Sequence, residues 1–140
     1  MKYYFVEPEV AGELGEKTIL DSSTHPPRVD KLHYKFSGWL GDAILESFPC
    51  VIVTKAASDV LKESGITGVQ FAEVETSISA EFREMYPQRK LPSFKWLRIT
   101  GTPGKDDFGI ADDLRLVVSE KALDLLRPLG IEHALVEAFA

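Results

Sequence analysis

The sequence predicts a single α+β domain in which short helices pack against a mixed, mostly antiparallel sheet. Three observations lead to this fold class. The chain has 140 residues without a Pro/Ser-rich linker, so it is expected to build one core over residues 1–140. Short β-prone segments alternate with short segments of helical periodicity. A strand-helix-strand unit also occurs twice, at about residues 50–76 and 114–139.

The duplicated unit is visible at a constant offset of 65 residues, between VTKAASDVLKESGI at 53–66 and VSEKALDLLRPLGI at 118–131. Thr54 and Ser119 stand at the helix starts, where a hydroxyl accepts hydrogen bonds from unpaired backbone amides. Gly65 and Gly130 stand where a helix stops in a left-handed conformation. Pro128 predicts that the second helix ends about one turn early. Strands precede the helices at 51–53 and 114–118 and follow them at 69–74 and 134–139.

The remaining elements are predicted from periodicity. Aromatic or alternating segments predict strands at residues 2–6, 31–37 and 94–100. Residues 39–48 place their apolar side chains at helical spacing, so a helix capped by Ser37 is expected there. A short helix is expected at 79–86. Residues 12–28 and 101–113, rich in Gly, Pro, Ser and Asp, are expected to be loops.

Composition limits the classes of function. The chain is 44% apolar and 27% charged, and its net charge of −6 is divided evenly between its two halves. Direct binding to nucleic acid is not expected, because that affinity comes from Lys and Arg neutralising phosphates. No apolar run approaches the ~18–20 residues that a membrane helix needs. The start of the chain lacks a signal-peptide pattern, and Cys50 stands alone, so we expect a cytoplasmic protein.

An acidic cluster in the second predicted loop is the first candidate site. Asp106, Asp107, Asp112 and Asp113 could bind a hard cation, face a protein partner, or form a plain solvated loop. The cluster lacks the alternating spacing and the glycine of a calcium loop, and no metal is predicted. Phe108, between the two acidic pairs, indicates a loop that inserts an apolar anchor into the core.

Other residues with reactive side chains give weaker signals. His25, His33 and His133 show no metal-ligand spacing. Cys50 precedes an apolar strand and is expected to be a buried thiol. Because no serine lies in a nucleophile elbow, the protein is not predicted to be an enzyme, and no cofactor is expected. The sequence leaves open whether Trp39 and Trp96 belong to the core or to an interface, and whether edge strands form a homodimer.

Four stretches together resemble a known group of proteins: WLGDAILESFPCVIVTKAASDVLKESGITGVQFAEVE, LPSFKWLRITG, DDFGIADD and LRLVVSEKALDLLRPLGIEHA. They resemble the immunity proteins encoded beside bacterial polymorphic toxins, within the group that includes the myxobacterial double-CXXCG paralogues. The resemblance covers roughly residues 34–138. The paired CXXCG sequences themselves are missing, so a structural zinc site is not carried over.

The resemblance implies a non-catalytic cytoplasmic protein that binds and blocks a cognate toxin, often a nuclease, encoded by a neighbouring gene. An acidic inhibitor associates faster with a basic toxin, because the electrostatic potentials of the two surfaces are opposite. The expected toxin-binding residues are Asp106, Asp107, Phe108, Asp112 and Asp113, with Glu73 and Glu75 as a second acidic edge. Two alternatives remain: a small metal-assisted hydrolase that uses the Asp106–Asp113 carboxylates, and a non-catalytic regulatory or scaffold module.

Overall fold

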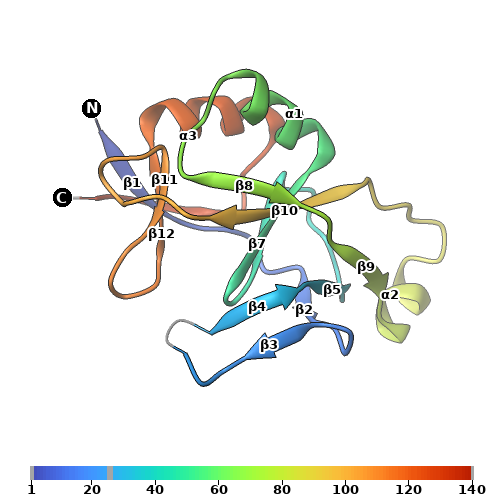
Figure 1. Cartoon of the computed structure of the whole chain (residues 1–140). Coiled ribbons are helices and arrows are strands. Elements are labelled where there is room, and N and C mark those ends of the chain that lie inside the picture. Colours follow the sequence, from blue (N-terminus) through green and yellow to red (C-terminus); the bar gives the residue numbers. More distant parts are fainter. Residues whose placement is uncertain (1, 25–26, 140) are drawn as a thin grey trace.

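Two four-stranded antiparallel sheets form the centre of the molecule (Figure 1). The computed structural model describes residues 2–24 and 27–139. The first sheet contains β1 (Tyr3–Glu7), β11 (Phe108–Ile110), β12 (Leu116–Ser119) and β13 (Leu135–Ala138), in the order β11-β12-β1-β13. The second sheet contains β6 (Ile44–Ser47), β7 (Cys50–Thr54), β8 (Val69–Ala72) and β10 (Phe94–Ile99), in the order β6-β7-β10-β8.

Each central sheet carries one helix that begins at the predicted hydroxyl cap. The helix α1 (Lys55–Glu63) follows β7, and the Thr54 Oγ1 accepts a hydrogen bond from the Ala57 backbone N–H at 3.2 Å. The helix α3 (Glu120–Leu126) follows β12, and the Ser119 Oγ accepts from the Ala122 N–H at 3.1 Å. As Pro128 predicted, α3 gives way to a 3₁₀ turn, η1 (Arg127–Leu129). The two helices contact each other on one side of the sheets (Figure 1).

The strand registers relate the two predicted units, at about residues 50–76 and 114–139, by a constant offset. The β10 residue that pairs with Val51 also pairs with Phe71, and the β1 residue that pairs with Leu116 also pairs with Val136. The offset of 65 residues therefore relates β7 to β12 and β8 to β13, the strands on either side of β10 and β1. The central strand differs in its place along the chain, because β10 follows its unit whereas β1 precedes its own. The two copies are thus related by a circular permutation.

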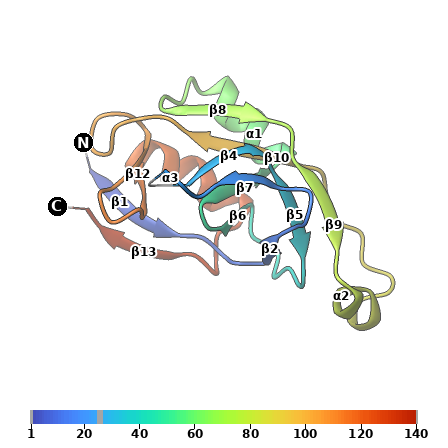
Figure 2. The ribbon, with the colours of Figure 1, turned by 60° about the horizontal axis from the view of Figure 1, so that its bottom comes forward.

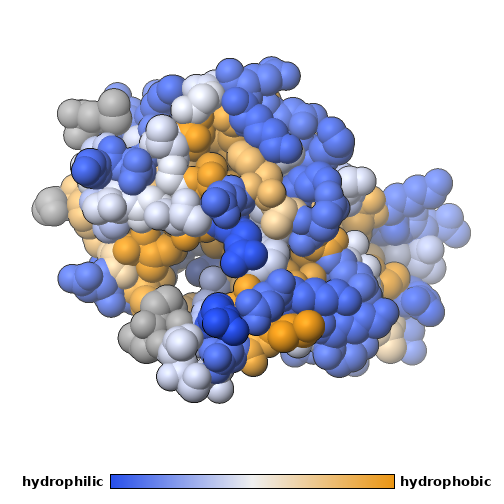
Figure 3. All heavy atoms as spheres, in the orientation of Figure 1, coloured by the Kyte–Doolittle hydropathy of each residue, from blue (hydrophilic) through white to orange (hydrophobic). Residues whose placement is uncertain are grey.

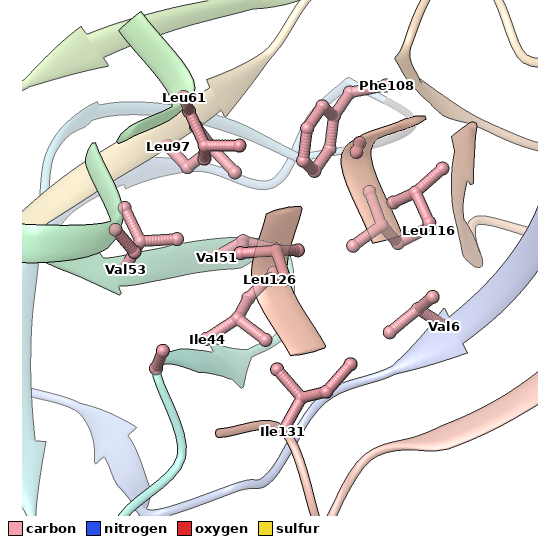
Figure 4. Close-up of a cluster of buried hydrophobic side chains, with 14 of the residues drawn as sticks. Val6, Ile44, Val51, Val53, Leu61, Leu97, Phe108, Leu116, Leu126 and Ile131 are labelled. Carbon is pink, nitrogen blue, oxygen red and sulfur yellow. The ribbon is translucent and has the colours of Figure 1, made fainter. Parts of the chain in front are cut away.

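The main core lies between the two sheets and beneath the two helices. Figure 4 shows Val6 and Leu116 of the first sheet facing Ile44 and Val51 of the second, with Leu126 of α3 among them. All five side chains are buried. Because both copies bury their inner faces in this one cluster, the repeats form a single domain rather than two.

A smaller layer covers the outer face of the second sheet. It contains β2 (Gly12–Leu14), β5 (His33–Phe36) and β9 (Glu75–Ile78) in the order β2-β5-β9, with β5 and β9 parallel. The hairpin of β3 (Ile19–Asp21) and β4 (Arg28–Lys31) and the helix α2 (Ala80–Met85) complete it. Figure 2 shows β2, β5, β9 and α2 at the end of the molecule away from both termini. The α+β fold class is confirmed, with mostly antiparallel sheets.

The helix predicted at residues 39–48 is wrong, and Ser37 caps no helix. Gly41 adopts φ +107, which interrupts helical backbone. The residues from Ile44 onward form β6, where Ile44 packs in the main core and Leu45 packs in the outer cluster. A strand that is buried on both faces has a continuous apolar run, and periodicity alone does not distinguish such a run from a buried helix.

Most other predicted elements are confirmed within a few residues, but the two predicted loops contain strands. Residues 12–28 contain β2 and β3 and lead into β4, whereas β11 lies inside residues 101–113. These strands are three residues long. A strand that short carries too few alternations to be detected from periodicity.

Candidate functional site

A groove opens where the turns of the two equivalent hairpins, β6–β7 and β11–β12, come together. It consists of two adjoining cavities of about 320 and 350 Å³. Both are lined by Glu46 and Phe48 of the first hairpin and by Leu114 and Leu116 of the second. We call these two cavities together the hairpin groove. Figure 3 shows apolar surface beside a hollow on this face, in the region between the β11–β12 turn and the β3–β4 hairpin of Figure 1.

Carboxylates dominate one half of the hairpin groove. Glu7, Glu46 and Asp113 line the second cavity, together with the single cation Arg115. Arg115 is already engaged: its Nε donates to the Asp113 Oδ2 at 2.8 Å, its Nη1 lies 3.7 Å from the Glu137 Oε2, and its guanidinium lies 3.6 Å from the Phe5 ring centroid. Glu7 and Glu46 therefore supply the uncompensated negative charge of this half.

Neither Glu7 nor Glu46 has an ion pair or a side-chain hydrogen bond with any residue in the described part of the chain. Glu46 is half-buried, whereas Glu7 is exposed. Burial and the neighbouring Glu7 charge together raise the pKa of Glu46. A positive group entering the groove would stabilise the ionised form of Glu46 and lower its pKa again.

Apolar side chains form the rim of the groove. Phe48 is 52% exposed and Val10 is 66% exposed, although both are large and apolar. Leu114 adopts a left-handed conformation with φ +70, which is uncommon for a residue with a Cβ. Its turn is closed by the Leu114 N–H donating to the Ala111 carbonyl at 2.8 Å. The rim thus combines exposed apolar surface with a strained turn, a combination found at binding sites.

The other half of the groove contains two arginines. The Arg98 guanidinium lies 4.4 Å from the Trp96 ring centroid, a cation–π distance. Arg28 pairs with Asp30 at 3.3 Å. Cys50 also lines this cavity; it is buried as predicted, and burial raises the pKa of its thiol to about 12. Such a thiol is not a nucleophile at neutral pH.

The predicted acidic loop mostly stabilises its own conformation. Asp106 Oδ2 accepts from the Thr102 N–H at 2.8 Å. Asp107 accepts from the Ser119 hydroxyl at 2.7 Å and from the Thr67 N–H at 3.0 Å. These hydrogen bonds lower the pKa of Asp107 although its partial burial opposes them.

Three further predicted contact residues differ among themselves. Phe108 is fully buried in the main core, so it is the predicted apolar anchor, and its assignment to the toxin-binding surface is wrong. Asp113 lines the hairpin groove and pairs with Arg115. Asp112 is exposed, and its carboxylate has no hydrogen-bond or ion-pair partner among residues 2–24 and 27–139. Of the predicted acidic residues of this loop, Asp112 and Asp113 are therefore the ones that are exposed to solvent.

The second predicted acidic edge lies elsewhere. Glu73 pairs with Lys95 at 2.7 Å, and Glu75 pairs with Lys17 at 2.8 Å. Figure 1 shows β9, which carries Glu75, at the opposite end of the molecule from β11. The structure thus does not join Glu73 and Glu75 to the acidic loop in one surface.

The buried carboxylates of Glu9 and Asp42 form a polar cluster with the exposed His133, which the sequence did not reveal. Their ligand atoms lie within 4.8 Å of one another, as a metal site would require. Each carboxylate already accepts hydrogen bonds from the protein: Glu9 from the Leu40 N–H at 2.7 Å, and Asp42 from the His133 N–H at 2.9 Å. The cluster thus ties the loop before β6 to the segment before β13.

The remaining sequence candidates have structural roles. Trp96 is buried in the outer cluster, whereas Trp39 is half-buried and donates its Nε1–H to the Asp42 carbonyl at 3.0 Å. His33 is buried, and its Nε2 lies 2.7 Å from the Ser77 hydroxyl. His25 lies outside the described residues.

The hairpin groove could not have been found from the sequence, because it brings together residues from five segments of the chain, within 6–10, 27–29, 46–51, 96–99 and 110–116. Its carboxylates come from β1, β6 and the β11–β12 turn. No protein-family model matches the sequence, and no curated protein matches it either. Among the described residues, no helix has the length and apolar character needed to cross a bilayer.

Proposed function

We propose that this protein is an immunity protein that binds a cognate bacterial toxin in the cytoplasm and blocks its active or substrate-binding surface. The toxin is a basic protein, for example a nuclease, encoded by a neighbouring gene. The resemblance of residues 34–138 to immunity proteins motivates the proposal. The observation that carries it is the hairpin groove, where the unpaired carboxylates of Glu7 and Glu46 lie between exposed apolar side chains.

This combination suits the recognition of a basic protein surface. Nuclease active sites must attract phosphates, so they present Lys and Arg that an acidic inhibitor can cover. Opposite potentials accelerate association, and apolar anchors such as Phe48 and Val10 slow dissociation by burying area. Inhibition by this route needs no bond to be made or broken, since occupying the toxin surface is sufficient.

The hydrolase alternative draws no support from the acidic loop. Asp106, Asp107 and Asp113 each accept hydrogen bonds from backbone or side-chain donors of the protein. Their oxygens are thereby directed at separate donors rather than at one common point. A metal-assisted mechanism needs such a common point.

The proposal is tested by co-expression with the toxin domain encoded by the neighbouring gene. The wild-type protein should restore growth and co-purify with that domain. The double variant Glu7→Gln/Glu46→Gln should restore growth poorly, whereas Glu84→Gln, on the exposed surface of α2, should act like the wild type. If the wild-type protein neither restores growth nor binds the domain, the immunity function is ruled out. A stable partner that is not a toxin would favour the scaffold alternative.

A further inference from the structure

We propose that the hairpin groove binds one arginine side chain of the partner protein, and that Glu46 accepts its guanidinium. The inference rests on the proposed function, because it names the chemistry that the same groove recognises. It assigns the specificity of the groove to a single half-buried carboxylate. Three independent features of Glu46 support it: the face of the sheet on which it lies, its counterpart in the other repeat, and its surroundings.

Glu46 occupies an inward-facing position of the second sheet. It pairs directly with Val51 of β7, which is buried in the main core. Directly paired residues of antiparallel strands project to the same face. Ile44, two residues earlier in β6, projects to that face as well and is fully buried. The carboxylate therefore stands at the end of an apolar row, where the core opens into the groove.

The other repeat has an apolar residue at the corresponding position. Ile44 pairs with Val53 in the first hairpin, and Phe108 pairs with Val118 in the second. Two residues further along each strand, Glu46 of β6 pairs with Val51, and Ile110 of β11 pairs with Leu116. Glu46 and Ile110 therefore occupy corresponding positions. Ile110 packs against the main core and also lines the groove.

The fold therefore accommodates an apolar side chain at this position. A half-buried carboxylate without a cation partner costs free energy in the isolated protein. Places where a sequence departs from the pattern of its own fold are typically functional. We therefore infer that Glu46 is present for a partner rather than for the fold.

The surroundings of Glu46 select a cation with a planar group. In the second cavity, Glu7 and Asp113 add negative charge, and Arg115 is engaged with Asp113 and Glu137. The first cavity, which Glu46 also lines, contains Arg28 paired with Asp30 and Arg98 stacked on Trp96. The space for an incoming cation is therefore in the second cavity. The exposed ring of Phe48 lines both cavities beside Glu46. A guanidinium can stack on an aromatic ring while it donates two hydrogen bonds to a carboxylate, which a lysine ammonium does not do. Arginine is therefore the side chain that this groove fits.

The test uses the whole ¹⁵N-labelled protein and two small probes, followed by NMR. The first probe is Nα-acetyl-arginine N-methylamide, and the second is the citrulline analogue, in which a neutral urea replaces the guanidinium. The arginine probe should shift amide signals of residues 44–48 and 110–116, and the citrulline probe should not. Glu46→Gln should weaken binding of the arginine probe about tenfold or more. The control Glu84→Gln should leave the affinity unchanged.

Each outcome decides between the two proposals. Absent shifts, equal shifts with citrulline, or an unchanged affinity in Glu46→Gln would each overturn the arginine proposal. The amide spectrum of Glu46→Gln shows directly whether that variant is folded. If the arginine proposal fails while the wild-type protein still restores growth, the immunity function stands and its contact lies elsewhere. If the probe binds as expected but growth is not restored, the partner is not the toxin.

Discussion

The carboxylate of Asp42 accepts two hydrogen bonds from His133, one from the backbone N–H and one from the ring Nδ1, each at 2.9 Å. The two residues are 91 positions apart; His133 lies in the second repeat, and Asp42 lies just before the β6–β7 hairpin that leads into the first. Asp42 is only 2% exposed. Beside them, the Ala43 N–H donates to the Gly130 carbonyl at 2.7 Å. Together these contacts attach the end of the second repeat to the start of the first.

The Asp42–His133 contact predicts that stability falls as the pH rises above 6.5, the ordinary pKa of a histidine. The hydrogen bond to Asp42 raises the pKa of His133 above its ordinary value of 6.5. The protonated ring therefore stabilises the folded state fully below pH 6.5, and this contribution is lost as the pH rises through the folded pKa. Urea midpoints measured from pH 5.5 to 9 should fall over this window. His133→Gln should flatten the fall, and an equally steep fall in that variant would contradict the assignment.

Removing the Asp107 carboxylate should destabilise the fold. Its oxygens hold Thr67, before β8, and Ser119, the cap of α3. Asp107→Ala should therefore lower the free energy of unfolding by about 1–3 kcal/mol. Asp112→Ala, with no such bonds, should change it by less than about 0.5 kcal/mol. Equal losses in the two variants, measured by urea denaturation, would show that the bonds to Asp107 carry no stability.

Replacing Glu46 by the residue found in the other repeat should stabilise the isolated protein. Glu46→Ile removes a half-buried carboxylate whose pKa is raised by burial and by Glu7, and it extends the apolar row of Ile44. We expect a gain of about 1 kcal/mol at pH 7. The same variant should lose binding to the toxin. A less stable Glu46→Ile protein would mean that the carboxylate belongs to the fold after all.

A circular permutant should fold. The Phe139 N–H donates to the Tyr3 carbonyl at 3.0 Å, so a short Gly/Ser linker can join residues 139 and 3. Opening the chain at Gly104, in an exposed turn with φ +79, places β1 after its repeat, as β10 follows its own. The permutant should show a cooperative thermal transition and native-like dispersion of its NMR signals. An unfolded permutant would indicate that the two copies are not equivalent folding units.

The sequence predicted the duplicated unit because its signals are local. The caps Thr54 and Ser119 and the early stop at Pro128 act within one turn of helix, and they are confirmed. The helix expected at residues 39–48 failed because Ile44 and Leu45 are buried on opposite faces of one strand. The alternation of apolar and polar residues identifies a strand only when one of its faces is buried, so it does not identify a strand that is buried on both faces.

The candidate site could be predicted only in part, because it depends on tertiary contacts. Asp107 and Phe108 looked like contact residues, yet Asp107 accepts hydrogen bonds from Thr67 and from Ser119, the cap of α3, and Phe108 fills the core. Glu46 lies within the helix expected at residues 39–48, and only the strand registers place it on the core face, at the position that Ile110 occupies in the other repeat. The acidic composition thus indicated the kind of partner, whereas the location of the contact required the fold.

The most direct test of the groove as the toxin-binding site is the dissociation constant of the purified complex with the neighbouring toxin domain, measured at low and high ionic strength. Glu7→Gln/Glu46→Gln should weaken binding by about tenfold or more and reduce the dependence of the affinity on salt, because two carboxylates no longer meet the basic surface. The control Glu84→Gln should bind like the wild type. A double variant that retains the wild-type affinity and salt dependence would contradict the central claim.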